Sequence, residues 1–310
     1  MRDAKKIKWS ANLDKQFKLG KKIPFNVECL RLEMYRPFTK KWLMYDRNIV
    51  ERPGQYYELW GKSNRVIYTT GKGANRPFSA LVTDNMPDIQ MMMNGQGFMR
   101  FNHSNRDELI HNANNVNEKF ADKLGLNIDD TFAYVYALLN SNEYQQRYAN
   151  DLRKDLARIP IVKGVEKYVN IGQKLINLHL NYEEVPTYSK VDIQYQGTPN
   201  YRVTKMKFTK KRNADGKLEN DRSTIVLNDT ISISNIPAKA YQYIVNGRSA
   251  IEWIMDQYRV KTDKKSGITD DPNDYSDDPK YIFNLLLRII NVSVQTVDLI
   301  NQLPKLQIVD

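Results

Sequence analysis

The feature that most constrains the fold is the separation of strand-like and helix-like patterns into different blocks of the chain. Short β-prone runs fill residues 26–84, helical spacing of apolar residues follows, strand patterns return over 188–233, and helical patterns resume at Pro237. Blocks of this kind indicate an α+β fold. The expected parts are a basic β-rich segment at 1–104, a helical segment at 105–185, a β-hairpin segment at 186–235 and C-terminal helices at 236–310.

Polar caps and breakers set the expected helix limits. Ser141 can cap a helix that ends before Pro160, and Ser249 can cap another that runs to Tyr258. The remaining expectations are helices at 107–124, 129–139, 164–182, 238–245 and 281–303, and a hydrophilic loop at 263–280.

Positive charge is concentrated at the start of the chain. The 310 residues carry a formal charge of +11, and residues 1–80 alone hold 18 Lys and Arg against 7 Asp and Glu. The other 230 residues hold 29 of each sign. Charge concentrated in this way predicts a surface that binds a polyanion. A basic leader would explain residues 2–22 only, and this start lacks the apolar stretch of a secretory signal.

Composition excludes several classes of protein. A hydrophobic content of 41% with 11% aromatic residues is that of a folded chain. The single cysteine, Cys29, excludes a disulfide framework within the chain and fits a reducing, cytoplasmic setting. No apolar run approaches the roughly 18 residues needed to cross a membrane, so no membrane association is expected. The abrupt polar start at Met1 is that expected of a fragment of a longer protein.

The stretch Tyr35–Arg47, YRPFTKKWLMYDR, is the first candidate for contact with nucleic acid. Apolar and polar residues alternate before Pro37 and a β-prone run follows it, which predicts a hairpin with Lys40 and Lys41 near its turn. Such a hairpin can pack one face on a core and turn its cations outward to a phosphate backbone. The alternative is an ordinary core hairpin whose lysines only keep the turn soluble.

A second basic hairpin is predicted around the turn Asn213-Ala214-Asp215-Gly216. Residues 201–222 hold 8 basic and 3 acidic residues, and strand patterns at 201–208 and 223–227 flank the turn. The alternative is a charged edge strand that resists aggregation. A basic glycine turn, Gly71-Lys72-Gly73, lacks the spacing of a P-loop but is able to approach phosphates. The candidate DNA-binding residues are Arg36, Lys40, Lys41, Arg47, Arg65, Lys72, Arg76, Arg202, Lys205, Lys207, Lys210, Lys211 and Arg212.

Motifs of catalysis are missing from the sequence. It lacks the phosphate loop of a helicase and the Asn/Asp-Pro-Pro-Tyr/Phe loop of an amino-group methyltransferase. Asp278-Pro279-Lys280 has the letters of a nuclease motif, but a proline-flanked acidic loop is poor geometry for two-metal chemistry. His179 lies between leucines, which favours a core histidine over a metal ligand. We therefore expect binding without catalytic residues, metal or cofactor in this chain.

Five segments resemble the C-terminal target-recognition region of single-polypeptide type I (type ISP) restriction–modification enzymes. They are YRPFTKKWLMYDR (35–47), FAYVYALLNSNEYQQRYANDLRKDLARIP (132–160), GQKLINLHLNYE (172–183), IPAKAYQYIVNGRSAIEWIMDQYRVKTDKKSGITDDPND (236–274) and YIFNLLLRIINVSVQTVDLINQLP (281–304). They occur in one order and cover nearly the whole chain from about residue 30. Where such proteins have a proline in the segment similar to 95–101, this chain has GQGFMRF.

The resemblance implies a longer parent enzyme with a nuclease, an ATP-driven DNA translocase, an adenine-N6 methyltransferase and then this region. S-adenosylmethionine, ATP and Mg would belong to that parent, and its methyltransferase and translocase domains would be partners of this one. The implied task is to recognise a short duplex DNA sequence, present one adenine for methylation and license translocation and cleavage. The alternatives are a docking module without sequence readout and a hidden metal-dependent nuclease.

Overall fold

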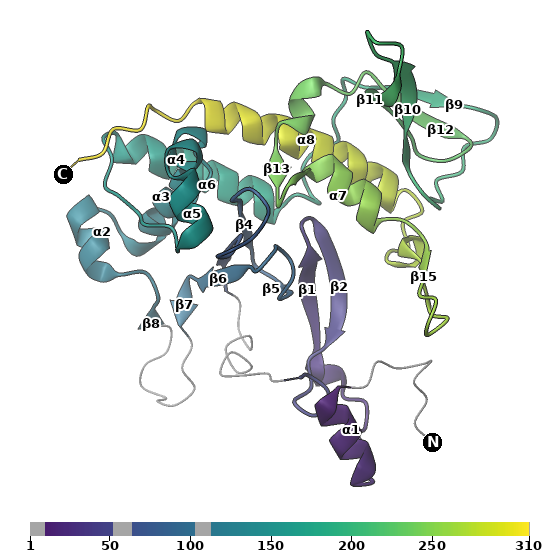
Figure 1. Cartoon of the computed structure of the whole chain (residues 1–310), viewed down its shortest axis with the longest axis horizontal. Coiled ribbons are helices and arrows are strands. Elements are labelled where there is room, and N and C mark those ends of the chain that lie inside the picture. The colour runs from purple at the N-terminus through teal and green to yellow at the C-terminus, as the bar shows by residue number, and fades with distance from the viewer. Residues whose placement is uncertain (1–9, 52–63, 103–112, 310) are drawn as a thin grey trace.

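The computed structural model of the protein describes residues 10–51, 64–102 and 113–309. The fold is α+β, as predicted, with a helical layer along the long axis and small sheets below it and at one end (Figure 1). The helices α6 (Val165–Leu180) and α8 (Tyr281–Asn301) lie side by side in that layer, and α3 (Ile128–Leu139) packs against α6. All three fall within a few residues of their predicted limits.

Two clusters of buried side chains hold the helical layer and the sheets together. The first joins α7 (Ala250–Gln257) and α8 to the turn of the N-terminal hairpin and to the sheet at the far end. The second joins α3 and α6 to the strand β4 (Ala80–Thr83) and to the C-terminal segment around Leu306. Both clusters take residues from several of the predicted segments, whose boundaries stay predictions.

The N-terminal hairpin forms as predicted, and its turn packs into the core. Strands β1 (Leu30–Arg36) and β2 (Thr39–Met44) pair antiparallel, β5 (Met86–Pro87) adds to β1 in parallel, and α1 (Ala11–Lys18) lies at the open end (Figure 1). Phe38 in this turn is 0% exposed, as in the alternative of a core hairpin. Its ring meets the rings of His179, Tyr182 and Tyr243 edge-on, at centroid distances of 5.3 to 6.5 Å. Burial of one aromatic ring is worth about 1.5–3 kcal/mol and carries the turn into the core.

A second three-stranded sheet lies beside this hairpin. Its order is β4, β3 (Val66–Thr69) and β6 (Gln96–Met99). The short strands β7 (Phe101–Asn102) and β8 (Ala113–Asn114) pair with each other, and α2 (Glu118–Leu124) follows. The strands predicted at 65–68 and 79–83 are confirmed, and the one predicted at 56–60 lies outside the described residues. The helix predicted at 107–124 is present from Glu118, and β8 lies where its middle was expected.

The predicted basic hairpin is part of a four-stranded sheet. The order is β10 (Lys207–Arg212), β11 (Leu218–Val226), β12 (Ile231–Ser234) and β9 (Asp192–Tyr195). The hairpin and its turn are confirmed, but the strand expected from residue 201 begins only at Lys207. The Asn273 side chain explains the delay, because it accepts from the N–H of Val203 and donates to its C=O, both at 2.8 Å. The backbone there needs no strand partner.

The helix expected at 238–245 is wrong. A single 3₁₀ turn at Ala238–Tyr241 is followed by β13 (Ile244–Val245) and β14 (Arg248–Ser249). Asn246 and Gly247 form the two-residue turn between them, with φ of 50° and 79°. An Asn-Gly pair is the usual choice for such a turn, because both positions need positive φ. The predicted cap of α7 is confirmed, since Ser249 and Glu252 form a capping box.

The other helical segments follow the expected caps. Ser141 caps α4 (Asn142–Arg147), which α5 (Ala149–Lys154) continues. The loop expected at 263–280 is interrupted by β16 (Thr269–Asp270), which pairs with β15 (Lys261–Thr262), and by a 3₁₀ turn at Pro272–Asp274.

The helix α8 corrects the expectation that no segment is long and apolar enough to cross a membrane. By length and composition this helix could cross a membrane, with a mean hydropathy of 1.3. Its most apolar stretch is 61% buried inside the protein, as in a core helix, so the helix is weak support for a membrane span.

Candidate nucleic-acid interface

Three of the predicted DNA-binding cations are used inside the chain. Arg36 pairs with Asp88 at 2.8 Å, Lys40 with Glu183 at 2.5 Å and Lys41 with Asp270 at 2.6 Å. Their side chains are only 19–25% exposed. The pairs fasten the N-terminal hairpin to the loop after β5, to the end of α6 and to β16. The structure therefore gives these cations a role in joining elements, and their contact with DNA stays a prediction.

Lys41 remains charged in this setting. Burial disfavours its ammonium group, but hydrogen bonds with Asp270 and Tyr275 outweigh that cost and raise the pKa of Lys41 above its usual value. Its ammonium also lies 4.8 Å from the ring centroid of Tyr35. The pair between β2 and β16 is thus a stable charged contact.

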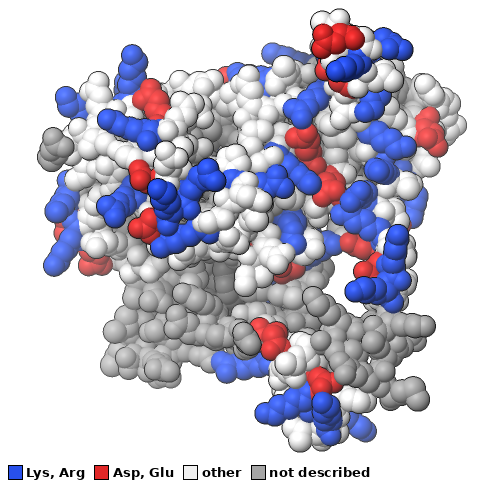
Figure 2. Space-filling view, in the orientation of Figure 1, with Lys and Arg blue, Asp and Glu red and all other residues white. Residues whose placement is uncertain are grey.

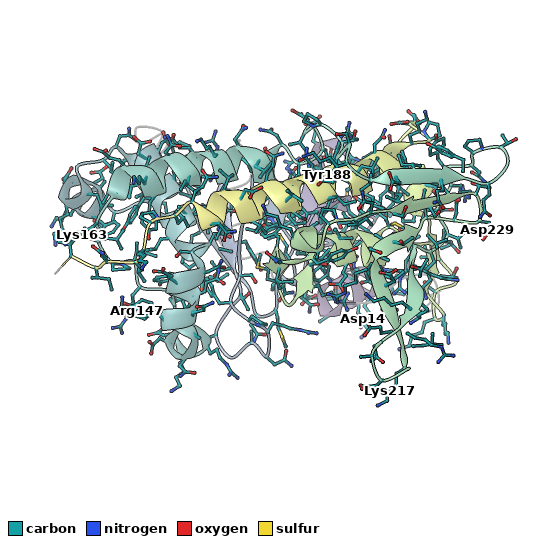
Figure 3. The ribbon with its side chains drawn as sticks, turned by 90° about the horizontal axis from the view of Figure 1, so that it is seen from above. Asp14, Arg147, Lys163, Tyr188, Lys217 and Asp229 are labelled. Atoms are coloured by element: carbon teal, nitrogen blue, oxygen red, sulfur yellow. The ribbon has the colours of Figure 1, made fainter. Side chains whose placement is uncertain are left out.

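One face of the molecule carries a different set of cations. Figure 3 shows two projections toward the same side, one at Arg147 on α4 and one at Lys217 at the end of the β10–β11 hairpin, while α6 and α8 run along the other side. In Figure 2, Lys and Arg gather over the region of α4 and α5 and over the hairpin. The face is therefore framed by two basic projections.

The turn that follows β3, residues 71–76, contacts the end of α5. Lys72 pairs with Asp155 at 2.8 Å, and the N–H of Gly73 donates to the carbonyl of Arg153 at 2.9 Å. Arg76, at the other end of this turn, lies against the β13–β14 turn, since a Cβ built at Gly247 would come within 2.9 Å of its Cδ. Cations distant in sequence are thus neighbours on this face.

The exposed side of α7 continues the series toward the β10–β11 hairpin. Arg248 pairs with Asp256 at 3.1 Å and Arg222 with Glu252 at 2.8 Å. The two carboxylates are four residues apart, so both arginines lie on the same side of α7. Each guanidinium also lies over an aromatic ring, 5.2 Å from Trp253 for Arg248 and 5.6 Å from Tyr241 for Arg222.

We call this series the cationic arc. Its members are Arg147, Arg153, Lys72, Arg76, Arg248, Arg222 and Lys211, the last two lining one hollow. Those in ion pairs remain accessible, with side chains 55% exposed at Lys72 and 54% at Arg222 and Lys211. Exposed pairs of this kind contribute only about 0–1 kcal/mol, so a phosphate can replace the carboxylate at little cost.

The remaining predicted cations lie apart from the arc. Arg202 pairs with Asp271, and Lys205 and Lys207 are exposed at the base of β10. Arg65 is exposed just before β3, and Arg47 is exposed at the open end of the hairpin near α1. Lys210 and Arg212 lie on the opposite side of the β10–β11 hairpin from Lys211, because side chains alternate along a strand. The structure thus joins Lys72, Arg76 and Lys211 but not the others.

Sequence reasoning missed four members of the arc. Arg222 and Arg248 had a usable signal, because one flanks the basic run and the other follows the Asn-Gly turn. Arg147 and Arg153 had none, since each is an ordinary polar position of a helical pattern. Only the packing of α5 on the turn at Gly73 brings them to this face.

The core contains a buried histidine, and no metal centre is found among the residues that the structure describes. His179 is 1% exposed, and its ring nitrogens contact the hydroxyls of Tyr136 at 2.6 Å and Thr296 at 2.8 Å. Burial lowers the pKa of His179 to about 3, so the ring is neutral and its role is structural, as predicted. Within residues 10–51, 64–102 and 113–309, no group of three or more His, Cys, Asp or Glu side chains could hold a metal ion.

Comparison with known proteins places the chain in a family. A family model described as the Type ISP C-terminal specificity domain matches residues 1–285. A search of curated proteins gives no match. Among solved structures, a nuclease-deletion mutant of the Type ISP restriction-modification enzyme LlaGI in complex with a DNA substrate mimic is 42% identical, with a TM-score of 0.85. The ATP-dependent Type ISP enzyme LlaBIII bound to DNA is 40% identical, with a TM-score of 0.87.

Coverage shows how much of those enzymes this chain represents. The alignments cover 98% of this chain but 23% of the LlaGI chain and 20% of the LlaBIII chain. A DrdV–DNA complex, 23% identical with a TM-score of 0.83 over 97% of this chain and 31% of that one, shows a shared fold alone. Because the family model matches most of the sequence, the chain belongs to the family of Type ISP C-terminal specificity domains.

Proposed function

We propose that this chain recognises a short duplex DNA sequence within a restriction–modification enzyme and holds the target adenine for an adjacent N6-adenine methyltransferase. The observation that carries the proposal is the cationic arc, a series of accessible cations from separate parts of a Type ISP specificity domain on one face. The DNA-bound states of LlaGI and LlaBIII, 42% and 40% identical to this chain, support it.

The arc would bind DNA in two ways. Its lysines would position the phosphate backbone and contribute affinity without sequence preference. Arg222 and Arg248 are the better candidates for base reading, because an aromatic ring and a carboxylate hold each guanidinium in place. A planar guanidinium fixed in this way is suited to bidentate contact with guanine in the major groove.

The parent polypeptide would supply the chemistry. In this proposal the chain itself performs no catalytic step and holds no cofactor, and S-adenosylmethionine, ATP and Mg belong to the methyltransferase, translocase and nuclease parts. Recognition of an unmethylated site here would license translocation and cleavage by those parts, in the cytoplasm.

A binding selection from randomised duplexes tests the proposal. The purified chain, alone and with the methyltransferase part added, should enrich one short motif. Arg222→Ala and Arg248→Ala should weaken binding and relax preference at one or more positions, by about 1–3 kcal/mol for a base contact. Lys174→Ala is the matched control, because Lys174 is exposed on α6, and α6 runs along the other side of the molecule (Figure 3).

Other outcomes would decide against the proposal. If neither sample enriches a motif, the chain is a docking module for its neighbours without sequence readout. If the chain alone cuts DNA when a divalent metal is added, it is a nuclease.

A further inference from the structure

A groove that shares no residue with the cationic arc lies between the N-terminal hairpin sheet and the second sheet. Its volume is about 730 Å³. Apolar and aromatic side chains form most of its walls, among them Met44, Met86, Met99, Tyr45 and Tyr68. These come from β2 and the residue after it, β5, β6 and β3, which belong to two neighbouring sheets (Figure 1). The groove therefore lies between the two sheets.

One carboxylate that lines the groove has no hydrogen-bond partner among the described residues. Glu33 on β1 is 7% exposed and lines the groove, and its side chain makes no hydrogen bond or ion pair with any described residue. The nearby charges are already in use, because Arg36 pairs with Asp88 and Lys41 with Asp270. Burial and the charge of Asp88 raise the pKa of Glu33 to about 7. A hydrogen-bond donor entering the groove would relieve this desolvated group.

Strand β6 gives the groove a flat side. Gly95 and Gly97 leave its backbone bare, and the ring of Tyr68 lies so close that a Cβ at Gly95 would come within 2.1 Å of it. Gln96 lies between the two glycines, is exposed and also lines the groove. In the described sheets, β6 pairs only with β3. Its other edge therefore presents backbone donors and acceptors beside the groove.

We propose that this groove binds one unstacked nucleobase that carries an exocyclic amino group, adenine or cytosine. The amino group would donate to the carboxylate of Glu33, which is the contact that Glu and Asp side chains make with cytosine N4. Tyrosine and methionine side chains would cover the faces of the ring, as in pockets that hold an extruded base. The carboxylates of Glu33, Glu51 and Asp88 exclude phosphate, so the ligand is a base and not the backbone.

This inference rests on the proposed function and extends it. A base paired inside a duplex cannot reach a carboxylate that is 7% exposed, so the base must leave the stack. The groove would then read one position of the site in a way that contacts along the cationic arc cannot. A lysine or arginine side chain of another domain could also pair with Glu33. Such a side chain would leave the tyrosine and methionine side chains of the groove without a flat ring to pack against.

Nucleosides and methionine methyl NMR of the full chain test the proposal without any duplex. At pH 8, cytidine and adenosine should shift the ε-methyl signals of Met44, Met86 and Met99 in a saturable way. Met206 and Met255, which lie outside the groove, serve as internal controls. Uridine and thymidine present a carbonyl in place of the amino group, so their binding should be weaker by about fivefold or more. Glu33→Gln should remove this preference, because an amide both donates and accepts.

Two results would overturn the proposal. The first is equal binding of uridine and cytidine, or no shift with any nucleoside. The second is a shift of the same methyl signals by arginine amide alone, which would assign the groove to a basic side chain. A failed nucleoside titration together with a successful duplex selection would remove only this inference. Nucleoside binding together with a failed duplex selection would instead contradict the proposed role of the cationic arc.

Discussion

At the scale of single residues, two buried titratable groups give opposite pH dependences to stability. The pKa of Glu33 is raised from 4.5 to about 7, so between these values the folded state keeps a proton that the unfolded chain has lost. Its contribution therefore weakens stability as pH rises through that window. The pKa of His179 is lowered from 6.5 to about 3, so the unfolded chain binds the extra proton and stability rises with pH across that window. The two effects oppose each other between about pH 4.5 and 6.5.

Glu33→Gln separates these two effects. Without the desolvated carboxylate, the free energy of unfolding at pH 8 should increase by roughly 1–3 kcal/mol. Between pH 4.5 and 7 it should rise more steeply with pH than that of the wild type, because only the histidine effect remains. Urea unfolding over a pH series measures both quantities, and Glu184→Gln, at an exposed carboxyl group, is the control. Parallel pH profiles for Glu33→Gln and the wild type would show that the buried carboxylate is not perturbed.

At the scale of elements, the packing of α3 on α6 depends on Gly172. A Cβ at this position would lie 2.0 Å from the carbonyl oxygen of Ala133, a backbone atom that moves only with its helix. Gly172→Ala should therefore lower the free energy of unfolding by about 2 kcal/mol, although alanine is the better helix former by about 1 kcal/mol. Asn170→Ala, at an exposed position of α6, should be neutral or slightly stabilising in the same denaturation experiment. Equal midpoints for the two variants would refute the close contact.

The ion pairs of the N-terminal hairpin make a second prediction about elements. Lys40→Ala leaves the partly buried Glu183 without its cation, so it should lower the free energy of unfolding by about 1–3 kcal/mol. Because Lys40 joins β2 to the end of α6, its loss should not change the salt dependence of DNA binding. Lys211→Ala should do the opposite, with little effect on unfolding and a shallower salt dependence. A salt slope reduced by Lys40→Ala would return this lysine to the DNA interface.

Local sequence signals predicted the elements whose backbone hydrogen bonds are made by residues nearby in the sequence. They failed where a side chain distant in the sequence makes the contact. The Ser249 capping box and the turn at 213–216 were predictable, because each uses residues within a few positions. The late start of β10 was not, since Asn273 lies 70 residues from Val203. The buried turn at Phe38 was missed for the same reason, because its ring partners come from α6 and the β13 region.

At the scale of the whole molecule, the distribution of charge along the sequence differs from the distribution of charge on the folded surface. The excess of cations in residues 1–80 predicts a surface that binds a polyanion, and two of those cations, Lys72 and Arg76, belong to the arc. Three of those cations are enclosed in ion pairs. The arc also takes Arg147, Arg153, Arg222 and Arg248 from the 230 residues that are neutral by count. The acidic residues of the same 230 positions cancel them in a sum, yet folding exposes these cations together on one face.

Salt dependence of DNA binding tests the arc as a unit. Arg76 lies against the β13–β14 turn and Lys211 on β10, and each that contacts a phosphate should add about 0.9 to the magnitude of the slope of log K against log salt. Arg76→Ala and Lys211→Ala should each make the slope shallower by about 0.9, and the double variant by about 1.8, if one duplex contacts both. Lys174→Ala on α6 should leave the slope unchanged. A double variant with the wild-type slope would mean that DNA lies elsewhere, and the exposed cations Arg47 and Arg65 outside the arc would be the next candidates.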